Sequence, residues 1–267
     1  MQQTLDIGYL NLFIGYLLIL VPVAIFYHFK TGLVKDSLIA VGRMTLQLFV
    51  VGLYLEVLFE YNNPWINALW WIAMVLIAAF TIIRRAYLAR RFFIIPLITS
   101  LVVSLALIDA YFIGLIIELD YFFDARYFIP ISGILLGNCL KTNVLGLNTF
   151  YQKLHHEKIR YRYYLANGAS RSEALRPFMR EALKTAFNPL IASITVIGLI
   201  SLPGMMTGQI LGGSSPEVAI KYQVMLMLTI FVATLLSVVL TITLANRLVF
   251  DGLGNMKKGV LKNNHMG

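Results

Sequence analysis

Seven stretches of this sequence are long and apolar enough to cross a lipid bilayer, and no other feature constrains the fold as strongly. A helical span needs about 20 mostly apolar residues. Barrel strands fit poorly, because they are about ten residues long and alternate in polarity. We therefore predict an all-α, polytopic membrane protein with about seven transmembrane helices in one domain, residues 1–267. The stretches are 8–29, 38–55, 65–83, 92–117, 127–149, 188–213 and 221–246.

The composition supports the same fold class. Of the 267 residues, 59% are hydrophobic and 13% are charged, whereas a soluble domain is about 45–50% apolar and roughly 25% charged. Such a chain has too few charges to cover a globular surface, which excludes a soluble enzyme, a disordered chain and a nucleic-acid-binding protein. The single cysteine, Cys139, forbids an intrachain disulfide, and no Cys/His spacing of the zinc type occurs.

Positive charge is distributed unevenly between alternate loops. Loops 27–37, 84–91 and 150–187 and the tail 247–267 hold 18 Lys and Arg, whereas the N-terminal residues and the other loops hold one, Arg126. Because Lys and Arg accumulate on the cytoplasmic side, we predict an outside N-terminus and a cytoplasmic C-terminus. No Lys or Arg precedes the first stretch, so we expect a retained span and not a cleaved signal peptide.

Residues 150–187 are longer than a connector needs and are predicted to form two cytoplasmic helices around a break. Asn167-Gly168 ends the first helix, since glycine tolerates the left-handed conformation found there. Ser170 caps the second helix, and Glu173 completes a capping box. The second helix has a basic side and an apolar side. This pattern suits either an interfacial helix on anionic lipid or a docking surface for a cytoplasmic partner.

The residues around this break resemble the coupling loop of ABC-transporter permeases. In that loop an Ala-rich helix, a glycine turn and a second short helix sit in a groove of the ATP-binding subunit. The resemblance is carried by Leu165-Ala166-Asn167-Gly168-Ala169-Ser170 and by Glu173-Ala174-Leu175. It implies that an ATP-binding subunit docks on Ala166, Gly168, Ala169, Ser170, Glu173 and Ala174.

A second run is similar to the signature of the FetB-like permeases, a bacterial iron-export ABC family with plant relatives linked to aluminium tolerance. The similarity implies a permease of the bacterial cytoplasmic (inner) membrane that works as a homodimer with two separate ATPase subunits in metal-linked export. The run is Ser201-Leu202-Pro203-Gly204-Met205-Met206-Thr207-Gly208-Gln209-Ile210-Leu211, and Asn188-Pro189, Pro216 through Tyr222-Gln223, and Gly137-Asn138 fit the same pattern.

No phosphate-binding loop of the form G-x-x-x-x-G-K-[ST] occurs in the chain. We therefore predict that the chain is not an enzyme and holds no cofactor, and that ATP and Mg are bound by a partner subunit. The expected partners are an ATP-binding cassette ATPase, a second permease copy and the lipid membrane, with no nucleic acid.

Uncharged polar and sulfur-bearing residues are candidates for a substrate pathway or gate. Pro203 should kink the sixth span, with Met205, Met206 and Gln209 beside it, and Asn138 lies near the middle of the fifth span. Thioethers favour soft ions, whereas iron favours carboxylate and imidazole, so these residues do not themselves select iron. A Met pair also serves as flexible packing, and Asn138 could equally form a hydrogen bond between spans. No metal ligands are assigned.

Glycines four residues apart form smooth strips that allow close helix contact. Gly204, Gly208 and Gly212 have this spacing on the sixth span, and Gly133 and Gly137 have it on the fifth. Such strips serve either packing within one subunit or a seam between two permease copies.

Three charged residues fall within the predicted spans. Arg43 and Lys141 lie toward cytoplasmic ends, where their side chains can extend to headgroups. Asp109 lies about 25 Å from the cytoplasmic start of its span. We expect it near the outer interface, within reach of Arg126.

Two other functions suit a protein of this class. An ATP-independent carrier or channel would show repeated broken helices, but no second segment resembles the Pro203 run. A membrane enzyme or scaffold would need titratable residues at one depth, which Arg43, Asp109 and Lys141 do not supply. We therefore expect an ABC-transporter permease that exports a metal, iron, by alternating access. Another cargo, such as a nucleotide sugar, is the alternative.

Overall fold

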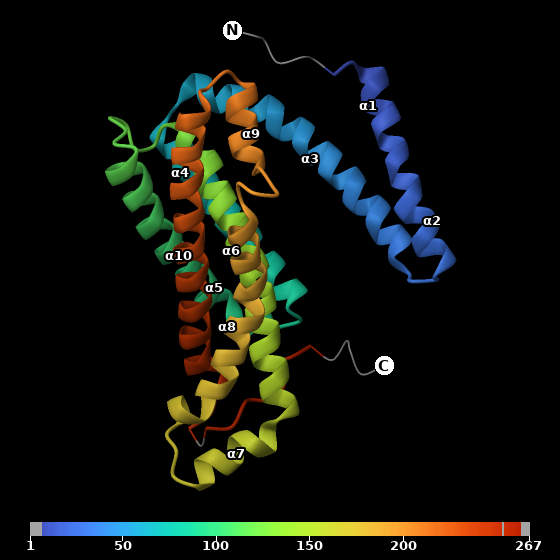
Figure 1. Ribbon diagram of the computed structural model, residues 1–267. Coiled ribbons are helices and arrows are strands. Elements are labelled where there is room, and N and C mark those ends of the chain that lie inside the picture. The colour runs from blue at the N-terminus through green and yellow to red at the C-terminus, as the bar shows by residue number, and fades with distance from the viewer. Residues whose placement is uncertain (1–6, 253, 263–267) are drawn as a thin grey trace.

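The computed structural model describes residues 7–252 and 254–262, and helices dominate this part of the chain. β-type pairing among these residues is limited to isolated bridges. Long helices stand side by side in an up-and-down bundle (Figure 1). This arrangement confirms the predicted all-α, polytopic fold. The bundle contains α4 (Pro64–Arg85), α5 (Arg90–Asp109), α6 (Ala125–His156), α8 (Arg171–Val196) and α10 (Pro216–Val249).

Six helical segments of the described chain are long and apolar enough to span a membrane. They match six of the seven predicted stretches, and several extend further than the apolar pattern indicated. The first segment contains α1 (Tyr9–Tyr16), a 3-10 turn (Leu17–Ile19) and α2 (Leu20–His28), and the second is α3 (Leu33–Tyr61). The others are α4, α5 with its π-helical extension (Ala110–Ile116), α6 and α10.

The seventh predicted stretch, 188–213, is divided and not continuous. Its first part is the end of α8, which stops at Val196, and its second part is α9 (Gly204–Leu211). The two parts follow one another along the bundle, and α10 then returns beside them (Figure 1). The expected kink at Pro203 is therefore a complete break. Gly198 has a left-handed φ of 84°, and proline disfavours helical geometry in the residue before it.

The buried core lies where α5, α6 and α10 meet, with α4 and α8 packed on either side. The hairpin of α1–α2 and α3 stands apart from this core in Figure 1. Leu58 is the one buried residue of α3. The hairpin therefore offers its apolar side chains to the surroundings, as a segment in lipid does.

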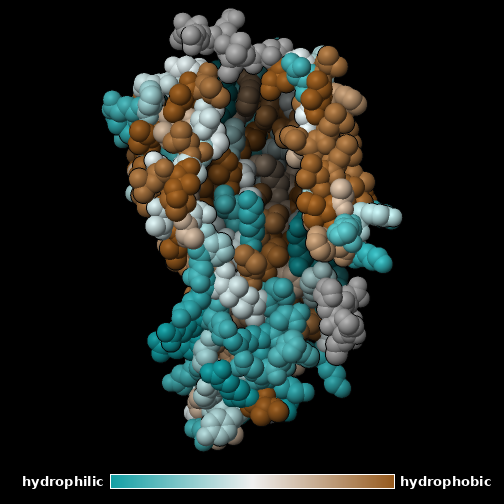
Figure 2. Space-filling view, turned by 45° about the vertical axis from the view of Figure 1, so that its right-hand side comes forward, coloured by the Kyte–Doolittle hydropathy of each residue, from teal (hydrophilic) through white to brown (hydrophobic). Residues whose placement is uncertain are grey.

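The two ends of the molecule differ in polarity. Hydrophobic residues cover most of the upper part in Figure 2, and hydrophilic residues gather at the lower end. The lower end holds α7 (Lys158–Ala166) and the start of α8. We call it the basic end, because these two segments carry most of the cations of loop 150–187.

The closest helix contact at a glycine occurs at Gly146 of α6. A Cβ placed there would lie 3.0 Å from Cγ1 of Val238 on α10 and 3.5 Å from Cβ of Ala186 on α8. Gly146 therefore lets three core helices approach one another. The predicted strips did not include it, because it has no glycine partner four residues away.

We predict that Gly146→Val destabilises the protein. Overpacking a well-packed core costs about 1–3 kcal/mol, and the added methyl groups would collide with Val238. Gly52→Val is the matched control, because Gly52 lies on α3 with nothing within 4 Å of an added Cβ. Thermal unfolding in detergent should show a lower midpoint for Gly146→Val than for Gly52→Val. Equal midpoints would show that the contact does not limit packing.

Candidate functional site

The two predicted cytoplasmic helices are extensions of the bundle joined by a short crosspiece. α6 continues to His156, so the helix expected to begin at Phe150 is the last part of α6. Glu157 separates it from α7, which ends at Ala166. α8 then starts at Arg171 and runs on to Val196 without interruption. We call residues 157–170 the elbow, since they connect two long helices at the basic end.

The turn of the elbow has the predicted capping geometry. Gly168 has a φ of 86°, a conformation that costs other L-residues about 1–2 kcal/mol. The N–H groups of Gly168 and Ala169 donate to the carbonyls of Leu165 and Tyr164 at 3.0 and 3.1 Å. These bonds satisfy carbonyls that the end of α7 leaves without helical partners. The sequence Asn167-Gly168 therefore ends α7 as expected.

The start of α8 is fixed by a reciprocal capping box. The N–H of Glu173 donates to Oγ of Ser170 at 3.3 Å, and the N–H of Ser170 donates to Oε2 of Glu173 at 2.8 Å. Hydrogen bonds from the Ser170 hydroxyl and then from its N–H hold the pKa of Glu173 below its ordinary value. Glu173 is therefore ionised at neutral pH and accepts both bonds.

Tyr161 anchors α7 to the bundle. Its ring is buried against Phe178 of α8 and Phe250 at the end of α10. Its hydroxyl donates to the carbonyl of Gly254 at 2.8 Å. Burial raises the pKa of Tyr161, so the hydroxyl keeps the proton that it donates.

The segment that follows α10 forms hydrogen bonds to the α4–α5 turn and to α7. The N–H of Ala89 donates to the carbonyl of Val260 at 2.9 Å, and the N–H of Lys262 donates to the carbonyl of Tyr87 at 2.9 Å. Residues 254–262 thus connect the α4–α5 turn with the anchor of α7.

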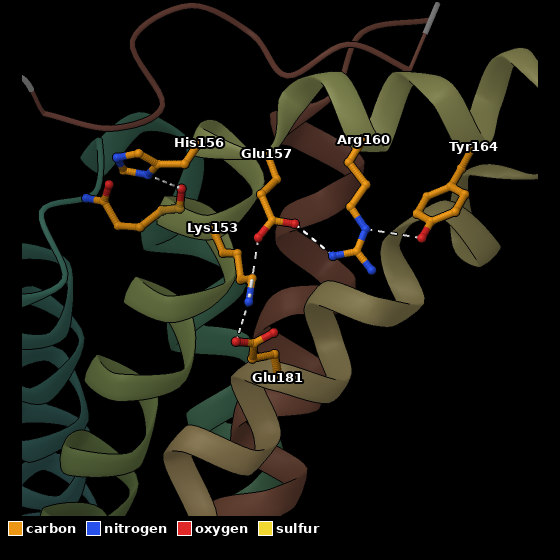
Figure 3. Close-up of polar contacts among 7 residues, drawn as sticks. Lys153, His156, Glu157, Arg160, Tyr164 and Glu181 are labelled. Carbon is orange, nitrogen blue, oxygen red and sulfur yellow. Dashed lines mark hydrogen bonds and ion pairs between the residues drawn. The ribbon is translucent and has the colours of Figure 1, made fainter.

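A chain of ion pairs connects α6, α7 and α8 (Figure 3). Lys153 of α6 lies between Glu157, at 3.6 Å, and Glu181 of α8. Glu157 accepts from Nη1 of Arg160 at 2.9 Å, and Nε of Arg160 donates to the Tyr164 hydroxyl at 3.1 Å. Isolated surface pairs contribute about 0–1 kcal/mol. This network joins three helices at the elbow.

The predicted docking residues fall into two groups. Ala166, Gly168, Ser170 and Glu173 are exposed, and Ala169 is half-buried, so a partner can reach them. Ala174 is fully buried, so its side chain can act only by packing beneath the turn. Sequence analysis did not identify two large apolar residues exposed on α7, Ile159 and Tyr163. The alternation of apolar side chains with Lys158, Arg160 and Arg162 is the signal that could have indicated a contact surface.

The predicted pathway residues near Pro203 lie at the opposite end of α8. Pro203 is the N-cap of α9, Met206 is buried, and Met205 and Gln209 are half-buried. The Oε1 atom of Gln209 is buried without a hydrogen-bond partner among the described residues. Leaving such an oxygen without a partner in an apolar surrounding is costly.

The break before α9 is apolar and exposed. Leu199 and Ile200 are 87% and 82% exposed. They belong to the non-helical segment 197–203, where the N–H of Gly198 donates to the carbonyl of Ser201 at 3.0 Å. α8 therefore joins the elbow at one end to an exposed break at the other.

Four of the five glycines in the predicted strips face open space within this subunit. A Cβ at Gly133, Gly137, Gly204 or Gly208 would meet nothing within 4 Å, whereas a Cβ at Gly212, the C-cap of α9, would lie 3.1 Å from the carbonyl oxygen of Gly208. Packing inside one subunit thus does not explain the spacing of these glycines. Asn138, next to Gly137, is half-buried, and its side-chain amide donates to the carbonyl of Ile134 at 2.8 Å. The strips and Asn138 therefore lie on surfaces that a second chain could cover.

The acidic residue within the spans does not make the expected contact with Arg126. Asp109 is 1% exposed. Its Oδ2 accepts from Oγ of Ser132 at 2.8 Å and from Nε1 of Trp71 at 3.3 Å. The expected contact with Arg126 is replaced by these donors from α6 and α4. Helical periodicity explains the difference, because Asp109 lies on the core face of α5. Arg43 and Lys141 are exposed in this subunit.

A second buried polar contact joins α6 to α10. The side-chain amide of Asn143 donates to Oγ of Ser237 at 2.6 Å, and Ser100 of α5 and Thr241 of α10 form a hydrogen bond nearby along these helices. Sequence analysis did not identify this contact. The spacing of Thr234, Ser237 and Thr241 on one helix face is the signal that could have indicated it.

The side chains of the described residues form no group of three or more His, Cys, Asp or Glu that could hold a metal ion. Met205, Met206 and Gln209 carry the thioether sulfur and amide oxygen atoms of α9, which follows the break. These residues can contact a cargo without providing a tight ligand shell, because hard cations bind carboxylate-rich sites.

Comparisons with known proteins agree on one family. The sequence model of UPF0014, described as an uncharacterised protein family, matches residues 9–250. The chain is 28% identical to the UPF0014 membrane protein YjkA of Bacillus subtilis, over 96% of this chain and 99% of that protein. It is 29% identical to the "Probable iron export permease protein FetB" of Escherichia coli, over 90% and 92% of the two chains.

A plant protein is also similar. The chain is 31% identical to the protein ALUMINUM SENSITIVE 3 of Arabidopsis thaliana, over 78% of this chain and 75% of that protein. No solved structure matches the chain. The relatives thus cover most of the bundle and include both ends of α8.

We predict that Ser170→Ala loosens the start of α8. Removing an N-cap side chain costs about 1 kcal/mol, equivalent to roughly fivefold faster hydrogen exchange by local opening of the first turn of α8. Ser172→Ala is the control, because Ser172 contacts only the Ser170 hydroxyl and caps no backbone amide. Hydrogen exchange measured by mass spectrometry separates the two variants. Equal exchange in both would contradict the role assigned to the cap.

Proposed function

The chain belongs to the UPF0014 family, and we propose that it is the membrane-spanning permease subunit of an ABC transporter. It is an integral inner-membrane protein with homologues named as permeases and membrane proteins. A separate ATPase subunit would bind ATP and Mg and supply the energy. The basic end would face the cytoplasm, because 18 of the 22 Lys and Arg lie in the loops assigned to that side.

The observation that carries this proposal is the connection between the elbow and the break. α8 is a single helix of 26 residues, about 39 Å long at 1.5 Å per residue. The exposed, capped turn lies at one end of α8, and the break at 197–203 lies at the other. A partner that moves the turn would therefore move the break through one rigid element.

Contacts between the elbow and the bundle would transmit such a movement to α8. Tyr161 fastens α7 to the core, and the Lys153–Glu181 pair fastens α6 to α8. Gly146 keeps α6 and α8 in close contact higher in the bundle. Closure of two ATPase subunits would thus tilt α8 against α6 and α10 and change access near Pro203 and Gln209.

A second permease copy would complete the pathway. Four glycines are open in this subunit, Gly133 and Gly137 of α6 and Gly204 and Gly208 of α9. The Oε1 atom of Gln209 is buried without a partner among the described residues. Close helix contact at small residues is a common basis of association in membranes. We therefore place the homodimer seam and the pathway at these two surfaces.

The proposed cargo is a metal ion, and iron is the first candidate because of the name of the Escherichia coli relative. Amide and thioether groups near the break would contact the ion weakly enough to release it. Export is proposed by alternating access between the two sides of the membrane. A nucleotide sugar and ATP-independent transport are the alternatives that the experiment must separate.

We predict that this protein co-purifies with the ATP-binding subunit encoded beside it and supports ATP hydrolysis in lipid. Fe²⁺ should stimulate turnover more than other divalent ions or nucleotide sugars do. Gly168→Trp should abolish co-purification, because it blocks the turn and requires an unfavourable φ. Co-purification and phosphate release are the measurements.

Gly32→Trp is the matched control. Gly32 also has a left-handed φ, of 73°, has open space around an added Cβ, and precedes α3 in a basic loop. If Gly168→Trp retains assembly and coupled transport as Gly32→Trp does, the docking assignment is wrong. Transport by the permease alone would favour the ATP-independent carrier.

A further inference from the structure

Lys141 continues the glycine strip of α6. It follows Gly137 by four residues, and Gly137 follows Gly133 by four residues, so the three lie along one side of the helix. Lys141 is exposed in this subunit, and a Cβ at either glycine would meet nothing within 4 Å. The proposed homodimer seam on α6 therefore includes a lysine.

Lys141 lies near the middle of the membrane. The ring of Tyr151 packs on Phe93 at a centroid distance of 4.8 Å, close to the basic turn between α4 and α5, and so marks the cytoplasmic end of the α6 span. Lys141 is ten residues from Tyr151, about 15 Å along the helix and half of the roughly 30 Å hydrocarbon core. The four-carbon stem of lysine is too short to carry its ammonium group across that distance to the headgroups.

No carboxylate in the described part of the chain is available to Lys141 at this depth. None of its ion pairs within 4 Å involves Lys141. Asp109 is buried beside Ser132 and Trp71, to which it is hydrogen-bonded. The other acidic residues of the six spans lie near the ends of their helices, namely Asp36, Glu56, Glu60 and Glu217.

A second copy of the chain does not change this balance. Two copies related by a two-fold axis along the membrane normal present the same residues at the same depths. The partner therefore brings a second lysine to the seam and no exposed carboxylate. Charged residues within spans almost always have a partner or face a water-filled cavity, and like charges repel. The seam is thus complementary to an anion.

Asn138 adds a hydrogen-bond donor to the same side of α6. It precedes Lys141 by three residues and is half-buried. Its side-chain amide carries two hydrogens, and one of them is donated to the carbonyl of Ile134 at 2.8 Å. The second hydrogen can be donated to an anion that Lys141 attracts.

The protein offers the proposed metal cargo few of the ligands that it favours. Iron favours carboxylate and imidazole groups, and the described residues form no group of three or more His, Cys, Asp or Glu. Carboxylate ligands would then have to arrive with the ion, on a small chelator. A tricarboxylate carries more negative charge than Fe²⁺ neutralises, so such a complex is an anion.

We propose that the cargo is an anionic complex of a metal ion with a carboxylate chelator, bound in the middle of the membrane by Lys141 and Asn138 of two copies. The chelator supplies the oxygen ligands of the metal. Lys141 pairs with the excess negative charge of the complex, and Asn138 donates a hydrogen bond to it. This inference rests on the proposed permease function and its homodimer seam, and it adds the chemical class of the cargo.

The test is anaerobic binding of radioactive Fe²⁺, with and without citrate, to the full-length permease in lipid nanodiscs. Fe²⁺ with citrate should bind more tightly than Fe²⁺ alone. Lys141→Gln should weaken binding of the complex about tenfold or more, because a charge-assisted contact is lost, and Lys141→Arg should retain most of it. Arg43→Gln is the matched control. It also removes one positive charge at an exposed position of a span, on the hairpin that stands apart from the bundle (Figure 1).

The outcomes separate this inference from the proposed function. Equal binding by Lys141→Gln and Arg43→Gln overturns the inference, and so does citrate that binds as tightly without the metal as with it. A dimer, measured by native mass spectrometry, that binds Fe²⁺ equally well with and without citrate overturns the inference and leaves the permease proposal standing. A monomer that binds neither overturns the homodimer seam and the inference together. Binding that depends on Lys141 without any coupled ATP hydrolysis contradicts the transporter proposal alone.

Discussion

The structure depends on one constraint, which is that hydrocarbon offers no hydrogen-bond partner to the backbone. Every N–H and C=O within a bilayer must be satisfied inside the protein, so the chain forms helices wherever it is apolar for long enough. The exception is the segment 197–203, where α8 ends before α9 begins. Non-helical backbone of this kind is tolerated at membrane depth when protein or water surrounds it. The exposed side chains of Leu199 and Ile200 therefore place the break where another chain or a pathway could cover it.

The fold could be predicted largely because hydropathy and length are properties of short segments. Six predicted spans match helices, and the capping box at Ser170 and Glu173 was identified from spacing alone. The break was predicted only as a kink. Pro203 marked its position, but the full loss of helical geometry also depends on Gly198, which the sequence analysis did not weigh. Pro177 and Pro189 show why proline alone is insufficient, since α8 continues through both.

The details of the site depend on tertiary contacts, which explains where sequence reasoning stopped. Gly146 has no periodic partner, and its role arises from Val238, 92 positions away in the chain. The expected contact of Asp109 was inferred from its depth in the span. Its hydrogen-bond partners are instead determined by the face of α5 on which it lies. The glycine strips were recognised by spacing, and the structure shows only that one subunit leaves them open. Short-range sequence patterns thus predicted the turn and the cap of the elbow, but they did not predict the contacts between helices in the membrane interior.

The support beneath the elbow also has a consequence for biosynthesis. Tyr161 donates to Gly254, and Val260 accepts from Ala89, so the base of the molecule is closed by residues that follow the last helix. A ribosome releases these residues only after α10 has been synthesised. A nascent chain can therefore insert its helices while the elbow still lacks its final support. The proposed docking surface is therefore completed only after α10 has been made.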